Sequence, residues 1–139
     1  MLSATLLKKI QAKLDQGDRL LDRDQFAKSW DAFGEAVSLI PDPKHEHEIS
    51  LSAYTALGEG FFFAGYYKKA LRAYKQAFKA PGGVENPLLH LRMGQAYFED
   101  GDLDRAADSL TRAYALDGRA VFQGEDKKYL SFLATRIKL

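Results

Sequence analysis

Residues 54–81 read YTALGEGFFFAGYYKKALRAYKQAFKAP, and a similar pattern returns in residues 90–117, HLRMGQAYFEDGDLDRAADSLTRAYALD. The two stretches match at a constant offset of 36 residues. The matched positions are Leu57/Met93, Gly58/Gly94, Phe61/Tyr97, Gly65/Gly101, Tyr67/Leu103, Ala70/Ala106, Tyr74/Leu110 and Ala77/Ala113. A repeat of this length predicts a stacked array of helical hairpins, which acts by presenting a surface.

A fainter third copy precedes these two. If Gly17 takes the position of Gly58, the later positions of the pattern fall on Leu20, Asp24, Phe26, Ser29, Phe33, Ala36 and Pro41. The first helix of this copy fits poorly, because Lys13 and Gln16 stand where apolar residues are expected. Terminal repeats are commonly atypical, since one of their faces meets solvent. We therefore predict repeats at about 10–41, 51–82 and 87–118 within a single domain of residues 1–139.

Helix boundaries follow from caps and glycines. Asn86 is a good N-cap before Pro87 at the first helical position, and Asp102 is a good N-cap for the next helix. Gly65 and Gly101 stand where the chain must reverse. Four helices are predicted in this way, at about 46–64, 67–79, 87–99 and 103–116. Five extra residues between the first two copies predict a longer loop or an extended helix start within residues 41–47.

The repeat stops after Leu116. Apolar residues then recur at three- and four-residue spacing, at Tyr129, Phe132, Leu133 and Ile137. This spacing puts them on one face of a helix. We predict one C-terminal capping helix at about 119–139 that covers the open end of the last hairpin, the last of seven helices.

Composition narrows the function. The chain has 139 residues, no cysteine and a net charge of +1. The lack of cysteine excludes disulfides and thiolate metal sites, and the small net charge argues against nucleic acid or an anionic membrane as partner. Lys8 and Lys9 interrupt the N-terminal apolar residues before a signal peptide could form. We expect a soluble, cytoplasmic protein.

At the repeated positions the chain resembles the tetratricopeptide-repeat family, over residues 11–118. The resemblance implies an all-α fold of three helical hairpins in a right-handed superhelix, closed by the capping helix. It also implies a non-catalytic protein-interaction module without a cofactor, in which the first helices of the repeats line a concave groove for a protein or peptide. Gly58 and Gly94 suggest in addition that another backbone passes too close to them for a side chain.

The resemblance also assigns groove positions. They are Leu14, Asp18, Leu21 and Asp22 in the first repeat, Thr55, Glu59, Phe62 and Phe63 in the second, and Leu91, Gln95, Phe98 and Glu99 in the third. One subfamily grips a C-terminal carboxylate with lysine and asparagine, but Thr55 and Glu59 stand at those positions here. An aromatic, mildly acidic groove is implied instead of a carboxylate clamp.

Residues 121–133, together with the segment from Pro81 to Pro87, are similar to small free-standing bacterial tetratricopeptide proteins. Some of these accompany secreted toxin systems as immunity or adaptor proteins. A toxin-neutralising or adaptor role is therefore one implied function. The alternative is a structural unit that associates weakly with further copies of itself and stacks end to end.

Two further clusters have ordinary and functional interpretations. His45 and His47 lie two residues apart, so they cannot share a helix face as metalloprotease histidines do. We expect exposed histidines at a helix start, and an enzyme or metal protein built on His45, His47 and His90 is the least favoured function. A basic stripe of Lys68, Arg72, Lys75 and Lys79 predicts a solvated outer face. Its functional alternative is attraction to an acidic partner or to a second copy.

Overall fold

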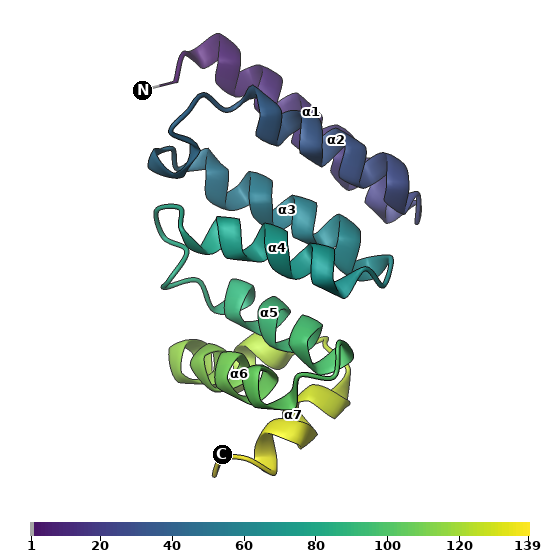
Figure 1. Cartoon of the computed structure of the whole chain (residues 1–139), viewed down its shortest axis with the longest axis vertical. Helices are drawn as coiled ribbons and strands as arrows, with labels where there is room; N and C mark the ends of the chain where they lie inside the picture. The colour runs from purple at the N-terminus through teal and green to yellow at the C-terminus, as the bar shows by residue number, and fades with distance from the viewer. Residues whose placement is uncertain (1) are drawn as a thin grey trace. The chain divides into compact units, whose positions relative to one another are not determined.

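The computed structural model describes residues 2–139, which are helical and contain no strand (Figure 1). The elements are α1 (Ala4–Asp22), α2 (Phe26–Leu39), η1 (Lys44–Glu46), α3 (Ile49–Phe63), α4 (Tyr67–Phe78), α5 (Pro87–Glu99), α6 (Leu103–Asp117), η2 (Gly118–Phe122) and α7 (Lys127–Ala134), where η marks a short 3-10 helix. They form two compact units, an N-terminal unit that ends at Val84 and a C-terminal unit that begins at Glu85.

The N-terminal unit consists of two helical hairpins, α1–α2 and α3–α4, and α2 also packs against α3. Apolar side chains spaced at three or four residues along α1 and α2 make its buried core. The core residues are Ile10, Leu14, Phe33, Ala36, Ile40 and Ala53. The second hairpin adds the fully buried Ala70, Tyr74 and Ala77 from α4.

The C-terminal unit consists of the α5–α6 hairpin and the segment that contains η2 and α7. Its core combines Leu91, Leu110 and Ala113 of the hairpin with Phe122, Tyr129 and Leu133 of that segment. The apolar stripe at the end of the chain therefore covers the last hairpin, as its spacing predicts. Leu133 is fully buried.

The helix ends confirm the predicted caps. Asn86 Oδ1 accepts a hydrogen bond from the Leu89 amide at 3.0 Å. Asp102 Oδ1 accepts one from the Arg105 amide at 3.2 Å. Gly65, with a φ of 86°, reverses the chain after α3 in a backbone conformation that favours glycine. Predicted helices 87–99 and 103–116 correspond to α5 and α6.

Three glycines in the first helices of the hairpins each lie under a large side chain sixteen residues later. A Cβ atom would come within 2.3 Å of Phe33 at Gly17, within 2.3 Å of Tyr74 at Gly58, and within 2.6 Å of Leu110 at Gly94. The identical relation confirms the alignment of the faint first repeat. It also corrects one expectation, because a side chain rather than a passing backbone fills most of the space beside Gly58 and Gly94.

Two predicted helix boundaries are wrong. The second hairpin begins at Ile49 rather than at residue 46, because the extra residues form a loop with the short turn η1. The capping segment is not one helix over 119–139 but two, η2 and α7. Gly124 adopts a φ of 79° between them, and the Asp126 side chain then caps α7 by accepting a hydrogen bond from the Lys128 amide at 2.9 Å.

Because the glycine positions have no room for a side chain, Gly58→Leu and Gly94→Leu should each lower the free energy of unfolding by about 1–3 kcal/mol or more. Gly34→Leu in α2 is the matched control, since no atom lies within 4 Å of its added Cβ. It should leave stability unchanged or raise it by up to about 1 kcal/mol. Urea unfolding curves measure all three variants. Unchanged stability of the first two would contradict the glycine contacts.

The cap can be tested with a pair of adjacent residues. Leu133→Asp puts a charge into the C-terminal core and should destabilise by more than about 3 kcal/mol. Ala134→Asp makes the same change at the next, exposed position and should have little effect. Circular dichroism melting and size-exclusion chromatography compare them. Equal melting of the two variants would mean that α7 does not cover the hairpin.

Candidate partner-binding site

Of the four predicted groove positions of α1, one is buried, one is partly buried and two are exposed. Leu14 belongs to the core, and Leu21 packs against it while partly buried. Asp18 and Asp22 are exposed. The two leucines thus hold α1 in place, and the two carboxylates are the groups of this set that a partner can reach.

Asp18 belongs to an acidic row, with Asp15 one turn before it and Asp22 one turn after it. Partial burial raises the pKa of the Asp18 carboxyl, and the negative charges of Asp15 and Asp22 raise it further. All three side chains are exposed. A cation placed beside the row would relieve this repulsion, so the row favours a positively charged ligand.

Helix α3 supplies two polar groove positions. Glu59 Oε1 accepts a hydrogen bond from the Tyr74 hydroxyl at 2.7 Å, which ties α3 to α4. Thr55 Oγ1 is buried, and no hydrogen-bond partner for it is found in the part of the chain that the structure describes. Both side chains are half-buried. Glu59 therefore serves the hairpin as well as the predicted groove.

The end of α3 carries an aromatic cluster. The Phe62 ring meets Phe63 edge-on at 5.3 Å between centroids, and it meets Tyr67 at 5.5 Å. Phe62 is half-buried in this cluster, whereas Phe63 is 47% exposed. An exposed phenylalanine supported by a neighbouring ring is the kind of anchor that interfaces use.

In the C-terminal unit, the chain itself covers the four groove positions of α5. Leu91 and Gln95 are buried. Phe98 contacts Tyr129 and Phe132 of α7, with ring centroids 5.5 Å and 5.1 Å away. Glu99 Oε1 accepts a hydrogen bond from the Tyr129 hydroxyl at 2.9 Å and pairs with Lys128.

A polar contact holds the start of this covering segment. Glu125 Oε1 lies 2.6 Å from Arg92 Nη1 and accepts a hydrogen bond from Gln95 Nε2 at 2.7 Å. The residue after Gly124 thus inserts a carboxylate beside a groove position of α5. Arg92 and Glu125 are absent from the predicted site. Glu125 lies outside the repeat, so the repeat pattern does not indicate that it contacts Arg92.

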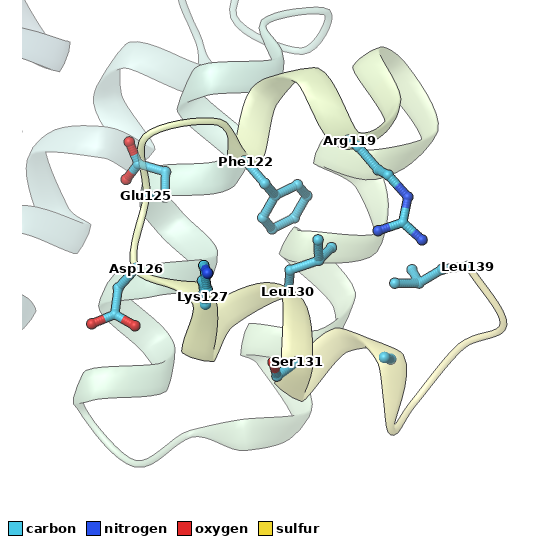
Figure 2. Close-up of a pocket in the computed structure, with 9 residues that line it drawn as sticks. Arg119, Phe122, Glu125, Asp126, Lys127, Leu130, Ser131 and Leu139 are labelled. Carbon is cyan, nitrogen blue, oxygen red and sulfur yellow. The ribbon is translucent and has the colours of Figure 1, made fainter.

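A pocket of about 390 Å³ lies within the C-terminal segment (Figure 2). The side chains of Phe122 and Leu130 point toward one another in it, and Arg119 extends toward Leu139. Its walls come from η2, α7 and the end of the chain. The pocket is mainly apolar, with charged side chains at its edge.

His45 and His47 are less exposed than expected, whereas His90 is buried, as its packing position in the repeat predicts. His45 Nε2 lies 2.8 Å from Gln76 Oε1, and its ring stacks on Tyr54. His47 Nε2 and the whole of His90 are buried. Within residues 2–139, no group of three His, Cys, Asp or Glu side chains is arranged to hold a metal ion. None of the helices described in that range is long and apolar enough to cross a membrane.

The sequence matches no protein-family model and no curated protein. Several solved structures are similar in fold. The type III secretion chaperone SycD of Yersinia enterocolitica, solved with a peptide of the translocator YopD, is 16% identical with a TM-score of 0.73, over 96% of this chain and 93% of that one. The N-terminal domain of stress-induced protein-1 from C. elegans is 16% identical with a TM-score of 0.71, over 96% and 98%.

A third structure, PcrH in complex with the chaperone-binding region of PopB, is 18% identical with a TM-score of 0.69, over 98% of each chain. At these identities the similarity concerns the fold. It agrees with the 36-residue repeat and with the three glycine contacts. The fold of this chain is therefore of the tetratricopeptide-repeat type.

Proposed function

We propose that the chain is a non-catalytic protein-interaction module whose N-terminal unit binds a segment of a partner protein on α1 and α3. The observation that carries this proposal is the exposure of Phe63 beside Phe62, at a groove position that the resemblance assigns. A large apolar side chain left in water favours a partner that buries it.

The charges beside this face define the partner further. Asp18 and Asp22 are exposed on α1, and the pKa of Asp18 is raised by burial and by its acidic neighbours. A ligand with lysine or arginine next to a large apolar side chain would satisfy both features. We therefore propose a cationic, amphipathic segment as the ligand of this face.

The C-terminal unit supports this choice of ligand. There, α7 lies against α5 and contacts the groove position Phe98 with Tyr129 and Phe132, while its Lys128 pairs with the groove position Glu99. A helix is thus a suitable occupant for a first-helix face of this chain. Leu91, Gln95, Phe98 and Glu99 would join the binding site only if a partner displaced the segment that covers them.

The similar structures support a peptide ligand, since SycD was solved with a YopD peptide and PcrH with a region of PopB. An adaptor and a toxin-neutralising protein would use the same face, and the identity of the bound partner distinguishes them. We favour both over end-to-end self-assembly. A second copy could not stack on the last hairpin without displacing α7.

The role of Phe63 can be tested with a control of equal exposure. Phe63→Ala should weaken binding of the partner by about 30-fold or more, because it removes a buried anchor from the complex. Leu116→Ala in α6 changes a residue that is also 47% exposed and should leave affinity unchanged. Calorimetry with the partner captured from cells measures both. If Leu116→Ala weakened binding and Phe63→Ala did not, the assigned face would be wrong.

The acidic row predicts that removing the charge of Asp18 raises the stability of the fold and weakens binding of the partner. Because the pKa of Asp18 is raised in the folded state, its ionisation disfavours folding, and this loss of stability develops as pH rises above the ordinary value of about 3.9. Asp18→Asn should therefore be more stable than the parent at pH 7 but not at pH 3, and should bind the cationic partner less tightly.

Urea unfolding midpoints at the two pH values measure the stability change. The control is Asp108→Asn, which removes an exposed carboxylate 3.4 Å from Arg112 and should not stabilise. An Asp18→Asn protein that is less stable than the parent at pH 7 would rule out the repulsive row.

A further inference from the structure

A second surface of the N-terminal unit has the opposite charge. The exposed side chains of α4 and its C-cap include five cations and no carboxylate. They are Lys68, Lys69, Arg72, Lys75 and Lys79. The chain as a whole has a net charge of +1, so this face is locally far more positive than the protein.

The basic face borders a pocket of about 360 Å³ that lies entirely within the N-terminal unit. Helix α3 contributes apolar and aromatic walls, and α4 contributes two cations, an alanine and an amide. The lining residues are Tyr54, Leu57, Phe61, Lys69, Arg72, Ala73 and Gln76. This volume is at the lower end of the range for ligand sites and suits one large apolar side chain.

At the Phe61 end of the pocket, aromatic rings pack against one another. Phe61 stacks on Trp30 of α2 with 4.9 Å between centroids, and Trp30 meets Tyr66 edge-on at 5.4 Å. Lys69 Nζ lies 5.8 Å from the Phe61 centroid and 5.4 Å from that of Tyr66. These contacts place an ammonium group over the aromatic wall.

At the other end of the pocket, His45 of η1 packs against the lining residues Tyr54 and Gln76. Its Nε2 atom lies 2.8 Å from Gln76 Oε1, and its ring stacks on Tyr54 at 6.2 Å. Burial, and to a smaller extent the charge of Asp42, raise the pKa of Tyr54, so its hydroxyl stays neutral. Both ends of the pocket are therefore built in advance of any ligand, which lowers the entropy lost on binding.

The cations at the edge are not neutralised by the protein. In the described residues 2–139, neither Lys69 nor Arg72 forms an ion pair with a carboxylate. Two cations at the edge of an aromatic pocket are complementary to a carboxylate next to a large apolar group. Leu57 and Phe61 line this pocket, whereas the proposed partner face uses Phe63, so α3 contributes to two separate surfaces.

We propose that this pocket is a second docking site, which takes an acidic segment of a partner protein with one large apolar side chain between aspartates or glutamates. The apolar side chain enters between Tyr54 and Phe61, and the flanking carboxylates lie against Lys69 and Arg72. A peptide fits better than a nucleic acid, because a single-stranded nucleic acid needs a row of aromatic platforms for successive bases.

The test uses the full chain and a capped synthetic peptide, EEDFEDE. Binding is followed by calorimetry and by the fluorescence of Trp30, the only tryptophan of the chain, which stacks on a wall of the pocket. We expect saturable binding that weakens with added salt. The matched peptides QQNFQNQ and EEDAEDE lack the carboxylates or the aromatic ring, and both should bind at least about fivefold more weakly.

Substitutions in the chain test where the peptide binds. Arg72→Gln and Lys69→Gln should each raise its Kd at least about fivefold. Lys9→Gln, which removes an exposed cation from α1, should leave the Kd unchanged, as should Phe63→Ala on the proposed partner face.

Four results would overturn this second site. They are no binding of EEDFEDE, equal binding of EEDAEDE, equal effects of Lys9→Gln and Arg72→Gln, or tighter binding of an oligo-dT strand than of the peptide. The loss of peptide binding in Phe63→Ala alone is a fifth such result, because it would place the peptide on α1 and α3. The proposed function of that face is judged separately, by the affinity of the captured partner for Phe63→Ala.

Discussion

The contact between a glycine in the first helix of each hairpin and a large side chain in the second is the constraint on which the structure depends. At Gly17, Gly58 and Gly94 the added Cβ would lie well inside van der Waals distance of that side chain. The contact lets the two helices of a hairpin approach closely, and it recurs with the same spacing each time. It thereby fixes which residues of the first helix face its partner and which remain for other contacts.

Helix α3 illustrates the consequence. Gly58 faces Tyr74, so residues on either side of it along the helix must turn to different surfaces. Phe61 packs against Trp30 and lines the pocket beside Lys69 and Arg72. Phe62 and Phe63 form the aromatic cluster at the proposed partner face. Three consecutive phenylalanines thus contribute to two different surfaces, the pocket beside Lys69 and Arg72 and the proposed partner face.

Local signals in the sequence were sufficient to predict most of the helices and their ends. The caps at Asn86 and Asp102 and the reversal at Gly65 are set by side-chain oxygens and by a missing Cβ, and both can be recognised in a short stretch. The break at Gly124 has signals of the same kind, but the apolar spacing after it concealed them. Contacts between distant residues, such as Arg92 with Glu125, leave no periodic trace and required the structure.

The site was less predictable for the same reason. The groove positions of the tetratricopeptide-repeat family indicate a face of the helices. Contacts with the rest of the chain determine which residues of that face are accessible. Leu14 and Leu91 are buried in the cores of their units, and Gln95 holds Glu125, while Asp18 and Phe63 remain exposed. The basic pocket was visible in the sequence only as a stripe on one helix, because its walls come from α3 and are held by Trp30 and His45.

The central claim is that α1 and α3 form the face that binds a partner. Hydrogen–deuterium exchange of the full chain, with and without the captured partner, tests it most directly. Binding on this face should slow exchange in residues 15–22 and 59–66 and leave α6 and α7 unchanged. Protection confined to the C-terminal unit, with residues 15–22 and 59–66 unaffected, would contradict the claim.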